Sequence, residues 1–226
     1  LEIQPGTKVG IVGHTGAGKT TFISLLMRFY EPQKGRILLD GKDLREYDLR
    51  SLRASIGVIQ QDAFVFSGTL QENVTFWRKG DSSGLAREAL GKMGYGSWWG
   101  EGERSRAQER GSNLSMGERQ VLAFGRALEA DPRVWILDEA TANMDSRTER
   151  SIQGELGRVS SGRTAILIAH RLATVQDADL ILVLHKGMLQ ESGRHESLLA
   201  QDGLYSRLYR YQRAQSVRSE RPVERR

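Results

Sequence analysis

Short apolar runs alternate along most of the chain with longer segments in which apolar residues recur at helical spacing. Continuous apolar runs of this length are typical of strands that are buried on both faces of a sheet. The segments between them, such as residues 116–130 and 146–159, predict amphipathic helices. The alternation therefore predicts an α/β fold with a mostly parallel sheet covered by helices on both faces. The predicted strands are residues 9–12, 56–59, 134–137, 164–169 and 180–184.

Turn signals predict two hairpins and one helix end. The Asp40-Gly41 pair lies between two short stretches of strand character, and the His185-Lys186-Gly187 turn precedes residues 188–191. Both predict hairpins, which would give the sheet a β-rich edge. We predict a helix over residues 21–30 that stops before Pro32, because proline disfavours helical backbone at the residue before it.

Two longer segments suggest the domain organisation. Residues 67–127 combine helical spacing with a stretch rich in glycine and tryptophan, from which we predict a helical subdomain inserted into the core. Residues 214–226 are rich in arginine and predict a basic, flexible tail. The main domain would then span residues 1–213.

Composition narrows the class of protein. The chain has 226 residues, of which 38% are hydrophobic and 27% are charged, and no apolar stretch approaches the ~18 residues of a membrane span. The absence of cysteine excludes disulfides, thiolate metal ligands and cysteine nucleophiles. The net charge of +5 is compatible with a nucleic-acid partner. Much of that charge lies in the last segment, however, so a solvated tail is the simpler interpretation and we expect no nucleic-acid partner.

One stretch matches the phosphate-binding loop G-x-x-x-x-G-K-[ST] at every fixed position. It follows an apolar run and precedes a predicted helix, which is the context that the motif requires. Its residues are Gly13, His14, Thr15, Gly16, Ala17, Gly18, Lys19 and Thr20, with Thr21 next in the helix.

The residue types of this loop suit the phosphates of a nucleotide. Glycines allow backbone N–H groups to turn inward and form an anion-binding concavity. The amino end of the following helix adds about half a positive charge. Lys19 would reach the β- and γ-phosphates, and the Thr20 hydroxyl would ligate Mg²⁺. We therefore predict that the chain binds a nucleoside triphosphate.

Two acidic residues follow the apolar run at 134–137. Asp138 and Glu139 come at the carboxyl end of a predicted strand, where α/β sheets bind their ligands. Asp138 suits a carboxylate associated with Mg²⁺, and Glu139 suits a group that polarises an attacking water. Gln61 and His170 also follow predicted strands. Taken alone, an ordinary loop glutamine and a hydrogen-bonded structural histidine are the simpler interpretations of these two.

The order and spacing of these motifs resemble the ATP-binding-cassette (ABC) ATPases, specifically the nucleotide-binding domain of exporter-type transporters. The resemblance covers residues 6–211. Five further positions match motifs of this family: Gln61 the Q-loop, residues 108–111 the X-loop, residues 114–118 the signature, residues 142–145 the D-loop and His170 the switch histidine.

The resemblance implies an ATPase that closes as a head-to-tail dimer around two ATP molecules and drives export through a transmembrane domain at the cytoplasmic face of the cell membrane. It implies that Lys19 and His170 hold the γ-phosphate and that Glu139 polarises water. Thr20, Gln61 and Asp138 would handle Mg²⁺ directly or through water. We expect the transmembrane helices, and the aromatic residue that stacks on adenine in this family, to precede Leu1 on a longer polypeptide.

The signature departs from the family pattern Leu-Ser-Gly-Gly-Gln. Ser115 and Gly117 are kept, and would contact the γ-phosphate bound to the opposing subunit, but Met116 and Glu118 replace the first glycine and the glutamine. Met116 adds bulk, and Glu118 adds negative charge near phosphate. The Ser115-x-x-Glu118 spacing is also that of a helix capping box. We hypothesise a weakened signature and a heterodimer with a second ABC subunit whose signature is intact; a homodimer is the alternative.

Two other functions fit the same motifs. A regulatory subunit would bind ATP with little hydrolysis; Glu139 argues against it, whereas the altered signature leaves it open. A non-transport ABC ATPase acting on nucleic acid would bind DNA or RNA with a steep salt dependence, and the exporter-like residues 108–111 argue against it.

Overall fold

The fold is built on one six-stranded sheet, seen in a computed structural model that describes residues 1–60, 63–75, 84–100, 105–138, 146–169 and 171–219. The strand order is β10-β9-β1-β8-β7-β4. All neighbouring strands are parallel except β10, which is antiparallel to β9. The strands are β1 (Lys8–Val12), β4 (Ile56–Ile59), β7 (Val134–Asp138), β8 (Thr164–Ile168), β9 (Leu180–His185) and β10 (Met188–Gly193). The prediction of a mostly parallel α/β sheet is confirmed.

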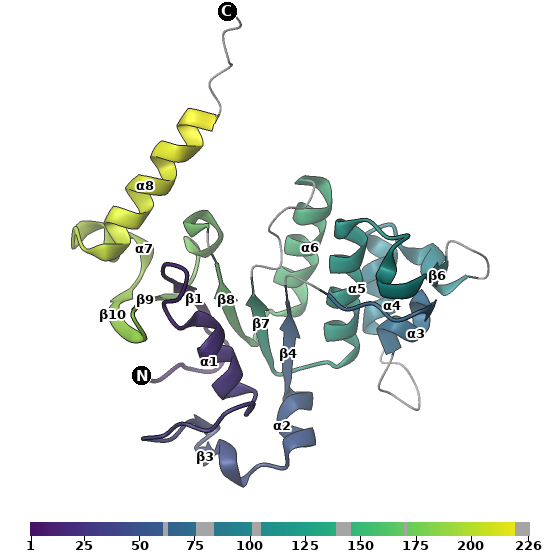
Figure 1. Ribbon diagram of the computed structural model, residues 1–226, viewed down its shortest axis with the longest axis horizontal. Coiled ribbons are helices and arrows are strands. Elements are labelled where there is room, and N and C mark those ends of the chain that lie inside the picture. Colours follow the sequence, from purple (N-terminus) through teal and green to yellow (C-terminus); the bar gives the residue numbers. More distant parts are fainter. Residues whose placement is uncertain (61–62, 76–83, 101–104, 139–145, 170, 220–226) are drawn as a thin grey trace, which may run out of the picture.

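Helices lie along the sheet and beside it (Figure 1). The α-helices are α1 (Lys19–Leu26), α2 (Leu49–Ser55), α3 (Leu70–Thr75), α4 (Leu85–Lys92), α5 (Met116–Glu129), α6 (Ser146–Val159), α7 (His195–Ala200) and α8 (Leu204–Ser219). Two small two-stranded sheets accompany them: β2 (Leu38–Leu39) with β3 (Lys42–Asp43), and β5 (Gly68–Thr69) with β6 (Arg106–Ala107).

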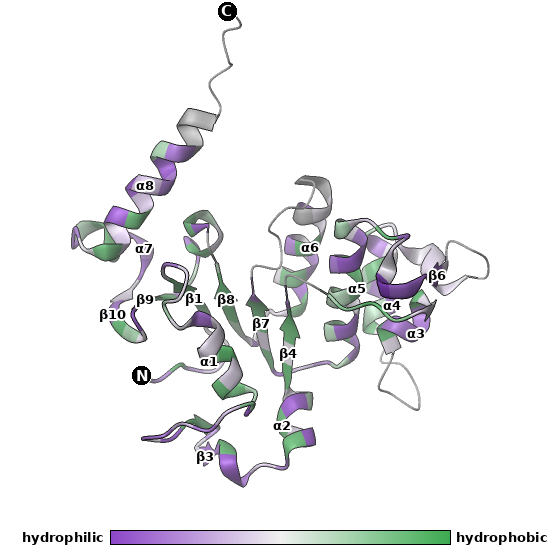
Figure 2. Cartoon of the chain, in the orientation of Figure 1, coloured by the Kyte–Doolittle hydropathy of each residue, from purple (hydrophilic) through white to green (hydrophobic). Residues whose placement is uncertain are grey.

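Successive residues of each central strand enter opposite layers of the core. Ile136 and Ile166 belong to the cluster that contains Ile23 of α1, whereas Trp135 and Leu167 belong to the larger cluster on the other face. This follows from the two-residue period of a strand. Figure 2 shows the central strands β4, β7 and β8 as mostly hydrophobic and most of the outer helices as mixed. Because both faces of the strands are apolar, helices must cover both faces.

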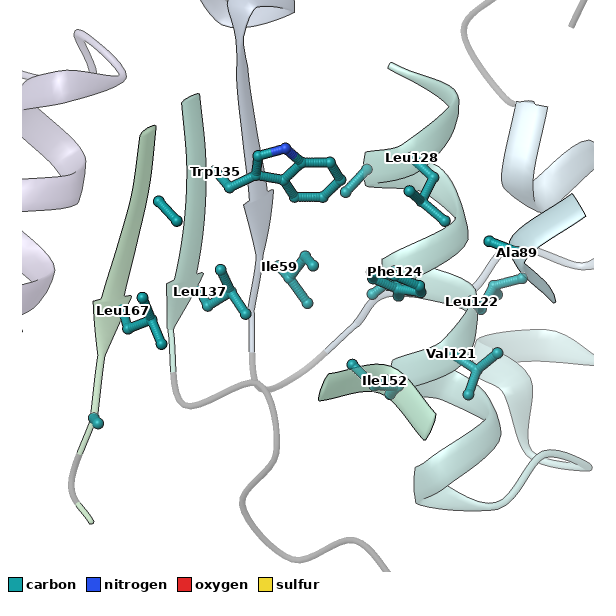
Figure 3. Packing of buried hydrophobic residues seen from close by; sticks show 14 of the residues in the cluster. Ile59, Ala89, Val121, Leu122, Phe124, Leu128, Trp135, Leu137, Ile152 and Leu167 are labelled. Atoms are coloured by element: carbon teal, nitrogen blue, oxygen red, sulfur yellow. The ribbon is translucent and has the colours of Figure 1, made fainter. Parts of the chain in front are cut away.

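The larger cluster joins the sheet to α5 (Figure 3). Trp135 and Leu137 point from β7 toward Phe124 and Leu128 of α5. Trp135 and Phe124 are fully buried. Fully burying a side chain of this size is worth about 1.5–3 kcal/mol. This packing fixes the position of α5, and with it the position of its amino end, relative to the sheet.

The other face of α5 packs against the neighbouring helices α3 and α4. A Cβ atom at Gly125 would lie only 2.8 Å from Leu90 Cδ1 of α4. Helices α5 and α4 therefore approach too closely at this point for a residue larger than glycine at position 125. Figure 1 shows α3, α4 and α5 gathered beyond β4, at one end of the sheet. We propose residues 67–127 as the inserted helical subdomain on the basis of this grouping.

Both predicted hairpins are present. At the first, Asp40 and Gly41 have φ of 50° and 79°; at the second, Lys186 and Gly187 have φ of 50° and 77°. These are the left-handed conformations that a two-residue turn needs in order to match the twist of its strands.

The first helix ends earlier than predicted. Instead of running to residue 30, α1 ends at Leu26, and Arg28 takes a left-handed conformation with φ of 49°. The Phe29 N–H then donates to Ser24 O at 2.8 Å, which closes the helix end. Arg28 Nη1 donates to the carbonyls of Leu44 and Tyr47 at 2.9 Å each, and these contacts hold the chain in the turn. Pro32 is therefore not what ends the helix.

At the other end of the chain, α8 continues to Ser219 and so includes the first residues of the segment predicted as a tail from 214. Its far end projects away from the sheet (Figure 1). Residues 220–226 lie outside the described residues, and the proposed boundary at 213 stays a prediction.

Candidate nucleotide site

The phosphate-binding loop connects the end of β1 to the start of α1, as the motif predicted. Gly13 has φ of 157°, and a Cβ atom there would lie 2.4 Å from Leu184 O and 2.9 Å from Ala17 Cβ. No other residue fits this position without displacing backbone. Ala17 N–H donates to His14 O at 3.0 Å, and Ala17 O accepts from Gly187 N–H at 3.0 Å. The loop is therefore closed on itself and tied to the β9–β10 turn.

A positive charge lies within this loop. Lys19 is 6% exposed, and its Nζ donates to Gly13 O at 2.8 Å and to His14 O at 3.3 Å. The amino end of α1 adds to this charge, because its first turn contains no acidic residue and Gly18, the N-cap, offers no side-chain acceptor. Thr20 is exposed beside it. Lysine and helix terminus together make a site for an anion.

Asp138 lies along the same edge of the sheet. It is the last residue of β7 and pairs with Ile168 of β8, which in turn pairs with Ile11 of β1. Two strand spacings, about 10 Å, therefore separate the backbone of Asp138 from the strand that leads into the loop. The carboxylate is partly buried. The sheet thus places a loop with a buried cation and a carboxylate at one edge.

Gln61, Glu139 and His170 lie outside the described residues, and their roles stay predictions. Their neighbours in sequence have a common location: Ile59 ends β4, and Ala169 directly follows β8. Both strands are parallel to β1, so their carboxyl ends lie at the edge that carries the loop.

The signature segment forms the amino end of α5. Ser115 is the N-cap, and its hydroxyl accepts from Glu118 N–H at 3.1 Å, while the Glu118 carboxylate accepts from Ser115 N–H at 2.8 Å. The capping box considered for this spacing is therefore present. Met116 is 45% exposed. Gly117 lies in the same first turn.

The structure does not bring Ser115 and Gly117 to the phosphate-binding loop of the same chain. Figure 1 shows α5 and α1 on opposite sides of β7 and β4. Signature residues with a γ-phosphate contact would need the loop of another subunit.

The donor set suits Mg²⁺. Mg²⁺ prefers hard oxygen ligands and is usually held by one or two carboxylates together with phosphates and water. Thr20 and Asp138 supply a hydroxyl and a carboxylate. Among the residues that the structure describes, no group of three or more His, Cys, Asp or Glu side chains could hold a metal without other ligands. The hydroxyl of Thr20 and the carboxylate of Asp138 are of the oxygen-ligand type that Mg²⁺ prefers.

Comparison with known proteins agrees with this geometry. The sequence model described as "ABC transporter" matches residues 1–142. The chain belongs to the ABC transporter family. Over all but a few of its residues it corresponds to the ATP-binding domain of exporter-type ABC transporters. The chain is 38% identical to a solved bacterial Atm1-family ABC exporter with ATP bound, and the two superpose with a TM-score of 0.86 over 100% of this chain and 39% of that one.

Sequence relatives give the same assignment. An uncharacterized ABC transporter ATP-binding protein of Bacillus subtilis, YknV, is 45% identical over 96% of this chain and 36% of its own length. The ATP-dependent lipid A-core flippase of Chromobacterium violaceum is 44% identical over 94% of this chain and 37% of its own length. The chain thus spans little more than a third of these ABC transporters. No helix among its described residues is long and apolar enough to cross a membrane.

Proposed function

We propose that this chain binds ATP with Mg²⁺ and hydrolyses it, and that closure of a dimer around ATP drives export through the transmembrane domain of a longer protein. The observation that carries the proposal is the buried Lys19 ammonium inside a closed glycine loop, at the same sheet edge as Asp138. We place this domain at the cytoplasmic face of the cell membrane, and we propose no nucleic-acid partner.

Each predicted residue has a defined role in the reaction. Lys19 and the amino end of α1 hold the β- and γ-phosphates, and His170 contacts the γ-phosphate. Glu139 polarises the water whose oxygen bonds to the γ-phosphorus as the bond to the bridging β–γ oxygen breaks. Thr20, Gln61 and Asp138 would hold Mg²⁺ directly or through water, and the ion would neutralise charge on the phosphate oxygens.

The signature supports a heterodimer. In a head-to-tail dimer, Ser115 and Gly117 would face the γ-phosphate on the opposing loop, where Met116 adds an exposed side chain. Glu118 is held in the first turn by Ser115 N–H, so its charge stays near that phosphate. A carboxylate there disfavours an anionic ligand. We therefore propose a second ABC subunit with an intact signature, which would complete the site that contains Lys19 and Glu139 of this chain.

The test is ATP turnover by the purified chain over a range of protein concentrations. The comparison is among the wild type, Glu139→Gln and the exposed-surface control Glu46→Gln. Under the proposal, the chain alone binds ATP and turns it over slowly. Met116→Gly with Glu118→Gln should then raise turnover several-fold, and Glu139→Gln should abolish the gain.

Two results would argue for other functions. Fast wild-type turnover that rises faster than linearly with concentration would show a working homodimer and refute the heterodimer. Tight ATP binding without turnover, even with the restored signature and the longer protein, would favour a regulatory subunit, the function that the altered signature otherwise supports.

A further inference from the structure

The loop that leads from β4 to α3 exposes two aromatic rings. Phe64 is 59% exposed and Phe66 is 39% exposed, and their rings meet edge to face with centroids 4.7 Å apart. Side chains of this kind would be expected to fold back onto the core, since each gains about 1.5–3 kcal/mol by full burial. Other interactions must therefore hold the loop backbone in the conformation that exposes these two rings.

Asn73 of α3 holds that backbone from one side. Its side chain is 1% exposed, and its Oδ1 accepts from Phe66 N–H at 2.9 Å. Its Nδ2 donates to Phe66 O at 2.8 Å and to Thr69 O at 3.0 Å. One amide thus pairs with both backbone groups of Phe66, as a neighbouring strand would do, and uses both of its hydrogens.

Arg126 of α5 holds the same loop from the other side. Its Nε donates to Asn73 O at 2.6 Å, its Nη2 donates to Asn73 Oδ1 at 2.7 Å, and its Nη1 donates to Phe64 O. The guanidinium carbon also lies 5.8 Å from the centre of the Phe66 ring, within range of a cation–π contact. One side chain of α5 therefore contacts both α3 and residues 63–69, the segment that carries Phe64 and Phe66 and is called the aromatic loop below.

Arg126 links two segments that both start near a residue predicted to contact nucleotide. The loop begins two residues after Gln61, and α5 begins at the N-cap Ser115. Arg126 lies 11 residues, about three helical turns, further along α5. A rigid helix transmits a displacement of its amino end to this position.

We propose that Arg126 and Asn73 are positioning residues that make the aromatic loop, residues 63–69, move as one body with α5. The functional consequence rests on the proposed ATPase. When the dimer closes, a displacement of Ser115 would move Phe64 and Phe66 by a similar amount, because the loop would not deform. The residue type matters, since a planar guanidinium can donate to three fixed acceptors at once and a lysine ammonium cannot match that geometry.

The chain lends itself to a direct test because it contains no cysteine. Cysteines introduced at Phe64 and Met116, both exposed, would carry spin labels on the loop and on the first residue of α5. The measured quantity is the width of the distance distribution between the two labels, without nucleotide, by pulsed electron paramagnetic resonance.

The compared variants are Arg126→Met, Arg126→Lys and Asn73→Ala. The control is Arg163→Met, because Arg163 also joins distant elements through Asp131 Oδ1 at 2.7 Å and Pro132 O at 3.0 Å, away from the loop. We expect Arg126→Met and Asn73→Ala to broaden the distribution about two-fold, Arg126→Lys to broaden it less, and Arg163→Met to leave it unchanged.

A folded Arg126→Met or Asn73→Ala variant with the wild-type width would overturn the proposal, as would equal broadening in the control. If Arg126→Met fails to fold, Arg126→Lys and Asn73→Ala decide the same question. Because no nucleotide is present, this result is independent of whether the chain hydrolyses ATP.

A kinetic measurement tests the functional consequence. In the longer protein, Arg126→Lys should lower kcat for ATP several-fold while the KM for ATP stays within two-fold of wild type, since the phosphate-binding loop is untouched. A rise in KM with unchanged kcat would contradict a role in transmission and would point to a defect in the nucleotide site.

Discussion

Replacing Glu118 separates its role in the helix cap from its charge. Glu118→Ala removes the acceptor of Ser115 N–H, a hydrogen bond of 2.8 Å, and also removes a negative charge from the amino end of α5. Loss of a capping interaction costs about 1 kcal/mol, and loss of the charge costs about 0.3–1 kcal/mol more. For a chain of this size, 1 kcal/mol corresponds to about 2–4 °C in Tm. We therefore expect Glu118→Ala to unfold about 3–7 °C below wild type.

Glu118→Gln should lose less, since the amide carbonyl can still accept from Ser115 N–H. Only the charge contribution is removed, so we expect a fall of about 1–3 °C. In 1 M salt the Debye length is about 3 Å, so the Tm of Glu118→Gln should nearly equal that of wild type. The Tm of Glu118→Ala should stay below wild type, because the loss of the hydrogen bond remains.

The assay is thermal unfolding followed by circular dichroism at low and high salt, with Glu2→Ala as the control for loss of an exposed carboxylate. Equal loss of stability in Glu118→Gln and Glu118→Ala at both salt concentrations would refute this separation of hydrogen bond and charge. The carboxylate would then have a role in α5 that neither its hydrogen bond to Ser115 nor its charge explains.

Three further predictions concern the loop, the core and the carboxyl-terminal helices. Gly13→Ala should abolish measurable ATP binding by calorimetry, because its Cβ would lie 2.4 Å from Leu184 O, whereas Gly16→Ala, with open space around its Cβ, should bind more tightly than Gly13→Ala. Leu122→Ala, at a fully buried position on the side of α5 that faces Ala89 of α4 (Figure 3), should lower the free energy of unfolding in urea by about 2–5 kcal/mol; a loss below 1 kcal/mol would mean that α5 and α4 are loosely packed against each other. Burial raises the pKa of Tyr205 from 10.0 to about 12. Its neutral form is favoured in the folded state, so this contribution to stability is complete below pH 10 and is lost as the pH rises through 12. Absorbance at 295 nm should show one tyrosine titrating late, and Tyr205→Phe should remove that step.

Much of the core could be predicted because local pattern and global fold agree. The apolar runs identified the buried strands, and the residue pairs Asp40-Gly41 and Lys186-Gly187 identified both hairpin turns. The phosphate-binding loop was predictable for the same reason: its glycines and Lys19 are adjacent in sequence, and their geometry is local.

The end of α1 could not be predicted, because it depends on contacts from a distant segment. Arg28 donates to carbonyls 16 and 19 residues away, and these contacts outweigh the helical tendency of residues 27–30. Arg126 was missed for the same reason, since its partners Phe64 and Asn73 lie 62 and 53 residues away. In the sequence, Arg126 is one of several charged residues of an amphipathic helix, and nothing in the pattern distinguishes it from its exposed neighbours or identifies its partners.

The row of paired residues that joins Ile11, Ile168 and Asp138 has a mechanical consequence. Hydrogen-bonded strands have a nearly constant separation, so the gap between the phosphate-binding loop and Asp138 cannot widen unless the sheet itself is broken. The sheet therefore holds the phosphate-binding loop and Asp138 at a fixed spacing, and movement around them has to come from the helices and loops attached to the sheet. Substitutions in α5 and its attached loop can then change such movements without changing that spacing.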